Sequence, residues 1–243
     1  MASINLQFYN ALWSDTHLEK PERFNTWPLM RGLADSASER LELGPGLRPR
    51  LPIAGTCFLD ISGRAAERLR QQGGNAMVGE ITALPFLDQR FELVGAFDII
   101  EHVEDDAHVL HELSRVLKDR GLLVFSVPLH AHLWTEFDKA VGHFRRYDPD
   151  VLQRLIAAHG FVVEKSAVFG MQPRSRWLLE LGTWMLRHHR ARAMRWYNRV
   201  FLPLGIFLQK PLQLEPGLIP TDDADEALLV CRRTPRREAA EIQ

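Results

Sequence analysis

Short apolar runs alternate with amphipathic stretches along the middle of the chain. The runs are rich in valine, leucine, isoleucine and phenylalanine, which predicts buried β-strands, and they cover residues 56–60, 91–97 and 121–128. Between them, residues 63–72 and 108–117 have the spacing of amphipathic helices, and Ser62 is placed to cap the first of these. Such an alternation predicts an α/β fold, with a mainly parallel sheet, helices on both faces and a ligand at the carboxyl ends of the strands.

A pair of glycines precedes the first of these runs. Gly44 and Gly46 allow a sharp turn and a close approach of the backbone to a ligand. The strand that follows ends on Asp60, where a carboxylate can accept two hydrogen bonds from a ribose diol. The layout predicts a nucleotide site, but not the dinucleotide motif G-x-G-x-x-G, because Pro49 stands where the third glycine is required.

Four further segments follow in a fixed order and are more specific than the glycines. They contain Leu-Pro-Phe, Glu-His-Val, Arg-Val-Leu-Lys and Ser-Val-Pro, within residues 79–86, 91–103, 112–118 and 121–128. From residue 39 to 170 the chain thereby resembles the S-adenosylmethionine-dependent methyltransferases of the Rossmann-like class, in their type 11/23-like form. The resemblance implies a methyltransferase, S-adenosylmethionine as cofactor, and a seven-stranded, mainly parallel Rossmann-like sheet with residues 226–232 as its antiparallel edge strand.

The resemblance also implies which residues surround the cofactor. Glu42, Gly44 and Gly46 would shape the pocket for the methionine end, and Asp60 would hold the ribose hydroxyls. The residues that border adenine would be Ile61, Glu80 and Ile81, and those that approach the methionine moiety Phe97 and His102. In chain order, the implied cofactor residues are Glu42, Gly44, Gly46, Asp60, Ile61, Glu80, Ile81, Phe97 and His102. For His102, a structural role as a helix-start histidine satisfied by the backbone stays open.

The connection between the glycines and Asp60 is shorter than is usual in this family. Only 16 positions separate Gly44 from Asp60, and three prolines fall among them. Because proline inside a helix costs about 3 kcal/mol or more, we expect the first crossover helix to be short or absent. Arg48, in the same connection, is either a solvated loop residue or a cation that reaches the cofactor carboxylate or an acidic substrate.

Candidate substrate chemistry gathers in residues 130–147, just after the third apolar run. The candidates are His130, Trp134, Asp138, His143, Arg145, Arg146 and Tyr147. His143 is our first choice for a general base, since its unperturbed pKa suits proton transfer near neutral pH. The two arginines match a carboxylate or phosphate, which favours an anionic substrate. The alternative is a structural network in which the arginines pair with Asp138 or Asp148.

The segment Gly-His-Phe-Arg-Arg-Tyr at residues 142–147 has the form GHxRRY. It is similar to a segment in a subset of these methyltransferases, some of which are linked to sugar or lipid-carrier pathways. A second group, His102, His108 and His111 with Asp105 and Asp106, raises the alternative of a metal-assisted reaction. Acids also suit the first turn of a helix, and no cysteine joins the group, so no metal is expected.

The two ends of the chain read as additions to a core at residues 39–170. Residues 1–38 carry aromatic side chains and predict a helical lid, or else packing over the sheet edge. Residues 171–232 predict a helical insertion and the last strand of the same domain, and residues 233–243 a flexible tail. A basic stretch in the insertion is typical of a solvated face over a core stripe; the alternative is a contact with an anionic membrane surface. Its arginines are Arg187, Arg190, Arg192, Arg195 and Arg199.

Composition narrows the class of protein. A chain of 243 residues with 46% apolar residues can form one α/β domain with a full core. A net charge of -1 argues against a nucleic-acid partner, and two cysteines without a disulfide framework fit a reducing compartment. No basic region followed by an apolar run opens the chain, so we expect no signal peptide and a cytoplasmic protein.

Taken together, these observations predict an enzyme that methylates an oxygen or nitrogen of a small, anionic or carrier-linked metabolite. The alternative is a non-catalytic cofactor-binding scaffold or partner subunit that kept the methyltransferase fold. The short connection after Gly44 and the glutamate at position 80, where the family more often has aspartate, motivate that alternative.

Overall fold

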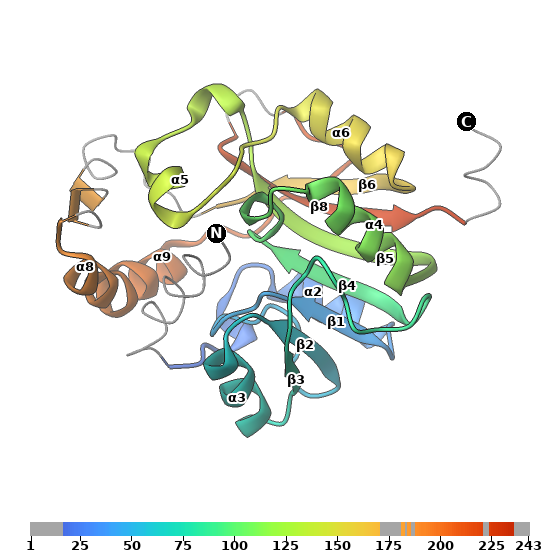
Figure 1. Ribbon diagram of the computed structural model, residues 1–243, viewed down its shortest axis with the longest axis horizontal. Helices are drawn as coiled ribbons and strands as arrows, with labels where there is room; N and C mark the ends of the chain where they lie inside the picture. Colours follow the sequence, from blue (N-terminus) through green and yellow to red (C-terminus); the bar gives the residue numbers. More distant parts are fainter. Residues whose placement is uncertain (1–16, 171–180, 183, 186–187, 221–223, 236–243) are drawn as a thin grey trace.

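One sheet organises the part of the chain that the computed structural model describes, which is residues 17–170, 181–182, 184–185, 188–220 and 224–235. Within this part the sheet has eight strands in the order β3-β2-β1-β4-β5-β8-β6-β7 (Figure 1). The strands are β1 (Arg40–Leu43), β2 (Thr56–Asp60), β3 (Asn75–Val78), β4 (Phe91–Phe97), β5 (Leu117–Pro128), β6 (Phe161–Val168), β7 (Glu215–Pro216) and β8 (Glu226–Arg233).

The first five strands of the sheet are parallel, which confirms the predicted topology. Strand β8 is antiparallel to both of its neighbours, β5 and β6, and β7 is antiparallel to β6. Residues 226–232 are therefore an antiparallel strand, as predicted, but they lie inside the sheet and not at its edge. The edge is the two-residue strand β7, which raises the count from the expected seven strands to eight among the residues described.

The helices and helical turns are η1 (Pro21–Arg23), α2 (Trp27–Asp35), α3 (Gly63–Gln71), η2 (Ile100–His102), α4 (Asp106–Val116), η3 (Ala131–Leu133), α5 (Glu136–Val141), α6 (Pro149–Ala158), α8 (Arg190–Trp196), η4 (Tyr197–Phe201) and α9 (Leu202–Leu208). The two helices predicted in the core are confirmed as α3 and α4. The side chain of Ser62 accepts a hydrogen bond from the backbone of Ala65, so it caps α3 as expected.

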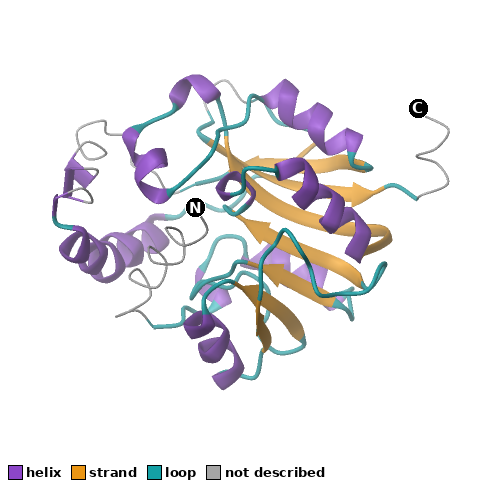
Figure 2. Ribbon diagram, viewed as in Figure 1, coloured by secondary structure: helices purple, strands orange, loops and turns teal. Residues whose placement is uncertain are grey.

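Apolar side chains cover both faces of the sheet, and Figure 2 shows helices on either side of the strands. On one face, Leu41 and Leu43 of β1 belong to a core cluster with residues of α4 and α6. On the other face, Met30 and Ala34 of α2 pack with buried residues of β4, β5 and β8. A sheet covered on both faces leaves the carboxyl ends of its parallel strands as the place for a ligand.

The connection from β1 to β2, residues 44–55, contains no helix, as predicted. Two features hold it in place instead. Leu47 and Leu51 are fully buried, and the carboxylate of Glu42 accepts hydrogen bonds from the backbone N–H groups of Arg50 (2.9 Å) and Leu51 (2.8 Å). The short connection is therefore anchored by a buried carboxylate and two leucines.

The described part of the predicted N-terminal lid packs on the sheet. Helix α2 buries Met30 and Ala34 against the face of the sheet over β4, β5 and β8, and not over the sheet edge that the packing alternative named. Residues 1–16 lie outside the described part of the chain. Within the insertion, α8, η4 and α9 follow one another, and Leu202 and Ile206 pack against Phe24. In the residues that the structure covers, no helix is both long enough and apolar enough to cross a bilayer.

Candidate active site

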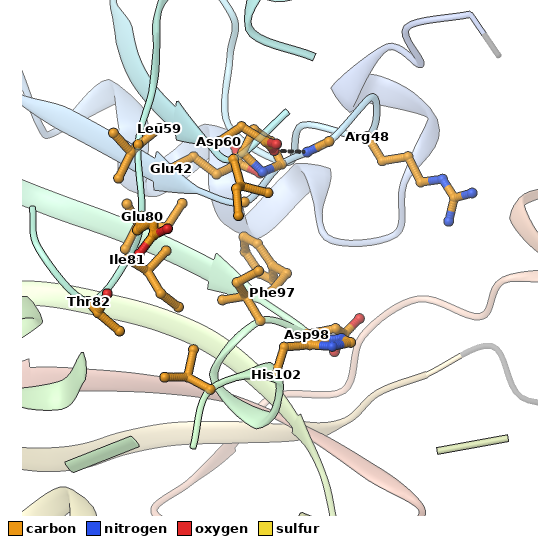
Figure 3. A pocket seen from close by; sticks show the side chains of 18 of the residues that line it. Glu42, Arg48, Leu59, Asp60, Glu80, Ile81, Thr82, Phe97, Asp98 and His102 are labelled. Atoms are coloured by element: carbon orange, nitrogen blue, oxygen red, sulfur yellow. Dashed lines mark hydrogen bonds between the residues drawn. The ribbon is translucent and has the colours of Figure 1, made fainter. Parts of the chain in front are cut away.

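A pocket of about 410 Å³ opens at the carboxyl ends of β1, β2 and β4 (Figure 3). All nine residues predicted to surround the cofactor line it, although they come from well-separated segments: Glu42, Gly44, Gly46, Asp60, Ile61, Glu80, Ile81, Phe97 and His102. The fold therefore brings the predicted cofactor residues to one site, while their individual roles stay predictions.

The two glycines shape the pocket through their backbone. Gly44 and Gly46 have φ of +58° and +54°, backbone angles that residues other than glycine rarely adopt. A Cβ at Gly44 would lie 2.6 Å from Ile99 Cδ1. The N–H of Gly46 donates to Asp60 Oδ2 at 2.8 Å, so the glycine turn is attached to the end of β2.

Asp60 is 5% exposed, and both of its oxygens already have a backbone donor. Besides Gly46, the N–H of Ser62 donates to Oδ1 at 2.7 Å. Burial raises the pKa of Asp60 to about 6, against the opposing effect of these two hydrogen bonds. Each carboxylate oxygen can accept a second hydrogen bond, so Asp60 can still receive a diol when it is ionised.

Glu42 supports the pocket from below. Its carboxylate is bound to the backbone of the 44–55 connection, and burial raises its pKa to about 7. Through this contact Glu42 holds the loop that carries the two glycines, while its role at the methionine end stays a prediction.

Arg50 and Asp98 also line the pocket, and neither was predicted to do so. Arg50 is 7% exposed, its guanidinium lies 3.7 Å above the ring of Phe24, and its Nη1 has no hydrogen-bond partner among the described residues. Burial lowers the pKa of Arg50 to about 10, which leaves it charged at neutral pH. A buried guanidinium in a pocket offers a contact for an anionic group of the cofactor or acceptor.

The sequence did contain a signal for Asp98 as a pocket residue: it directly follows strand β4, and Asp60 likewise stands at the end of strand β2. It has φ of +50°, and Ser126 Oγ donates a hydrogen bond to its Oδ1. Burial, and then the charge of Asp98 nearby, raise the pKa of Glu226 well above its usual value. By contrast, nothing in the sequence separates Arg50 from Arg48, since the path of the connection decides which of them is buried.

Arg48 lies at the rim of the pocket. Figure 3 shows its side chain pointing away from the other labelled residues. Its guanidinium bonds to Tyr197 Oη and Asn198 Oδ1, each at 3.2 Å, and lies 5.0 Å from the centre of the Tyr197 ring. Arg48 thus connects the pocket rim to η4, a contact that neither of its two predicted roles included.

His143 is held by a buried carboxylate. Its Nδ1 lies 2.9 Å from Asp138 Oδ1, and Arg146 Nε donates to the same oxygen at 2.9 Å. Burial raises the pKa of Asp138, but hydrogen bonds from His143, Thr135 and Arg146 outweigh burial and lower it below its ordinary value. Because Asp138 is ionised, it favours the tautomer of His143 with the proton on Nδ1 and the lone pair on Nε2.

His102 connects His143 to the pocket. The two rings meet edge to face with centroids 4.6 Å apart, and His102 itself lines the pocket. Burial lowers the pKa of His102 to about 3, so the ring is neutral. Its neighbour Glu101 is fully buried, and burial raises the pKa of Glu101 well above its usual value.

The arginines and the tyrosine of the GHxRRY segment have internal partners. Arg146 is paired with Asp138, as in the structural alternative, and Arg145 Nη1 contacts Asp106 Oδ2 at 2.7 Å, an acid that this alternative did not include. Tyr147 Oη donates to the same oxygen of Asp106 at 2.9 Å. These contacts position the loop, and a direct role of the three residues in catalysis stays untested.

His130 and Trp134 belong to the same loop but do not line the pocket. His130 precedes η3 with φ of +62°, and Trp134 is 40% exposed. Two members of the second candidate metal group, His108 and Asp105, already have partners. His108 Nε2 lies 2.9 Å from the carbonyl of Thr82, and Asp105 accepts a hydrogen bond from the backbone of His108. Those two residues are therefore engaged at the start of α4.

Comparison with known proteins agrees with this geometry. Residues 47–125 match the family model described as a methyltransferase domain. A probable S-adenosylmethionine-dependent methyltransferase of Mycobacterium tuberculosis is 32% identical over 97 residues, which are 39% of this chain and 35% of the relative, and its counterpart in a second strain gives the same values. The chain thus spans about a third of the length of the curated relatives it matches.

Solved structures share the fold at low sequence identity. A methyltransferase of Thermotoga maritima, described as a possible histamine N-methyltransferase, has a TM-score of 0.55 and 16% identity, covering 88% of this chain and 91% of that one. A methyltransferase of Mesorhizobium loti has a TM-score of 0.54 and 15% identity, covering 88% and 100%. The 4+2 cyclase SpnF has a TM-score of 0.55 and 16% identity, covering 85% and 80%.

The predicted α/β Rossmann-like methyltransferase fold is therefore confirmed. The family match and the curated relatives support the predicted class of enzyme, an S-adenosylmethionine-dependent methyltransferase, and with it the predicted cofactor. Because SpnF is a cyclase on the same fold, the fold alone does not fix the reaction.

Proposed function

We propose that this protein transfers a methyl group from S-adenosylmethionine to an oxygen or nitrogen of a small, anionic or carrier-linked acceptor. The observation that carries the proposal is that the nine cofactor residues implied by the resemblance, from well-separated segments, all line one pocket. Asp60 at the end of β2 and the glycine turn after β1 lie where this fold binds a ribose and the adjoining part of a nucleotide.

The acceptor side of the site is the end of the pocket at His102 and Phe144. There the loop that carries His143 meets the cofactor residues, because the His102 and His143 rings are in contact. Methyl transfer is an in-line displacement, so the enzyme gains most by aligning the two reactants, an effect that can reach about 7 to 11 kcal/mol. The buried cation Arg50 favours an anionic partner.

Replacing Asp60 with alanine tests this proposal. At pH 7.5, calorimetric titration of S-adenosylhomocysteine should show saturable binding to the intact protein, weakened in Asp60→Ala by roughly 10- to 150-fold. This is the loss of a charge-assisted hydrogen bond, about 1.5 to 3 kcal/mol. Asp150→Ala, which removes an aspartate that is paired with Arg154 on the exposed face of α6, is the matched control and should bind as the intact protein does.

The same titration has a pH dependence. Because burial raises the pKa of Asp60 to about 6, the carboxylate becomes protonated as the pH falls through 6, and affinity should decrease there. Absence of binding by the intact protein at any pH would contradict the proposal and favour the alternative, a scaffold that kept the fold without the cofactor.

We also propose a peripheral contact with an anionic membrane surface through the segment from α8 to α9. Its exposed side chains include Arg192, Arg195 and Arg199. Large apolar side chains on the same segment are also exposed, namely Trp196, Phe201, Leu204, Phe207 and Leu208, at 51%, 50%, 50%, 83% and 64%. On an anionic membrane, arginines contact the lipid headgroups while neighbouring apolar side chains enter the acyl-chain region. Arg187 and the side chain of Arg190 lie outside the described part of the chain.

This surface adjoins the pocket rim, because Arg48 contacts Tyr197 and Asn198 of η4. A membrane contact here would present the pocket to a lipid-linked acceptor. We expect the protein to sediment with phosphatidylglycerol vesicles at low salt, and Phe207→Glu to weaken this at least tenfold, since burying a phenylalanine contributes about 1.5 to 3 kcal/mol. Leu87→Glu, at an 80% exposed position outside this segment, is the control. Equal sedimentation of the two variants would contradict the proposal.

A further inference from the structure

Three side chains, those of Glu101, His102 and His143, meet where the loop of residues 130–147 reaches the pocket. One potential ligand atom from each lies within 4.8 Å of the others. Glu101 Oε1 and His143 Nε2 are 3.9 Å apart. Two ligand atoms of a tetrahedral zinc ion, with bonds of about 2.0 to 2.1 Å, lie roughly 3.3 Å apart, so an approach of about 0.6 Å would bring these two atoms to one ion.

One nitrogen of each histidine ring is already hydrogen-bonded, as is usual for metal-binding histidines. His143 Nδ1 is bound to Asp138, which is itself held by Thr135 and Arg146. The His102 ring has a hydrogen bond with the backbone of Gly142. Carboxylates and backbone carbonyls in these positions orient imidazole ligands and raise their basicity.

Glu101 supplies an independent observation. Its side chain is fully buried, yet neither carboxylate oxygen has a hydrogen-bond partner within the described part of the chain. A buried polar group without a partner is costly, by about 1 to 3 kcal/mol for a neutral group and more for a charge. A cation between Glu101 and His143 would remove this cost.

We propose that Glu101, His102 and His143 bind a divalent transition-metal ion, zinc by its donor preference. Two imidazoles and one carboxylate are the donor set of zinc sites that keep a fourth position open for water or a substrate. His102 lines the cofactor pocket, so the open position is next to the acceptor side. A role of the metal toward the acceptor rests on the proposed methyl transfer. Metal binding itself does not, because it can be measured without cofactor or acceptor.

Zinc affinity and stoichiometry test the proposal directly. The purified full chain, stripped with a chelator, is titrated with Zn²⁺ in competition with a chromophoric chelator, and with Co²⁺ for its visible spectrum. We expect about one ion per chain and the absorption of a four-coordinate Co²⁺ site. Glu101→Gln and His143→Gln should each lose this site, whereas Asp138→Asn should weaken it about 10- to 100-fold through the orientation of His143.

His132→Ala is the matched control, because His132 lies in a second group with His130 and Asp148 that also has the spacing of metal ligands. Retention of zinc by this variant and loss by the Glu101 and His143 variants would support the assignment. If either of those two variants fails to fold by circular dichroism, His102→Gln replaces it. Absence of zinc binding by the intact chain, or unchanged binding in the folded cluster variants, would overturn the proposal. Neither result depends on whether S-adenosylhomocysteine binds.

Discussion

Replacing Asp138 with alanine is expected to lower the free energy of unfolding by about 3 to 5 kcal/mol, because it leaves a buried charge without its partner. The Asp138 side chain is fully buried, and that of Arg146, which donates to it, is 2% exposed. Hydrogen bonds lower the pKa of Asp138, so its contribution is present at neutral pH and is lost only in acid. Urea denaturation at pH 7 measures the difference.

Asp150→Ala is the control for this change. It removes a carboxylate of the same size from the pair with Arg154, whose side chains are 67% and 71% exposed. Surface pairs of this kind contribute at most about 1 kcal/mol. A loss in Asp138→Ala no greater than in Asp150→Ala would show that Arg146 finds another partner, and the network would then not hold the loop.

The second large effect is expected at His143. Replacing it with alanine should lower methyl transfer by roughly 10²- to 10⁴-fold, the contribution of a positioned base or of a metal ligand beside the acceptor. Affinity for S-adenosylhomocysteine should stay unchanged, since His143 does not line the pocket. The assay follows label from S-adenosylmethionine into metabolite and lipid extracts of cells, and calorimetry follows binding.

The two roles of His143 Nε2 exclude each other, and chelation separates them. If Nε2 is a metal ligand, transfer by the intact protein is lost on chelation and returns with Zn²⁺. If it is a base, chelation leaves the rate unchanged. A His143→Ala variant with full activity would contradict both roles.

Most of the fold could be predicted because its signals are local. Apolar runs and caps located β2, β4, α3 and α4, and the prolines after Gly44 predicted a short or absent crossover helix, which is absent. The predicted position of β8 at the edge of the sheet was wrong, because the order of strands depends on which edges are free after the parallel strands have paired. No local pattern in residues 226–232 carries that information.

The site divides in the same way. Residues at strand ends, such as Asp60 and Phe97, could be placed at the pocket because the carboxyl ends of parallel strands meet at one edge. The partner of Arg146, Asp138, was one of the two acids predicted, but Asp106, the partner of Arg145, was not, since the acids around the two arginines come from different elements. The sequence does carry a signal for a supporting role of Asp138, because Thr135 and Asp138 have the spacing of a capping box, which the structure contains.

The place of β8 in the sheet bears on how the chain is made. Residues 226–233 pair with β5 on one side and β6 on the other, and Leu122 is opposite Arg232, a residue synthesised much later. Until that segment leaves the ribosome, β5 and β6 each present an open edge of backbone donors and acceptors, which is a template for aggregation. The sheet therefore cannot be completed until β8, its last strand in the sequence, has been synthesised. A chain that stops short of residue 226 should depend on chaperones to remain in solution, even though every pocket-lining residue named above has already been made.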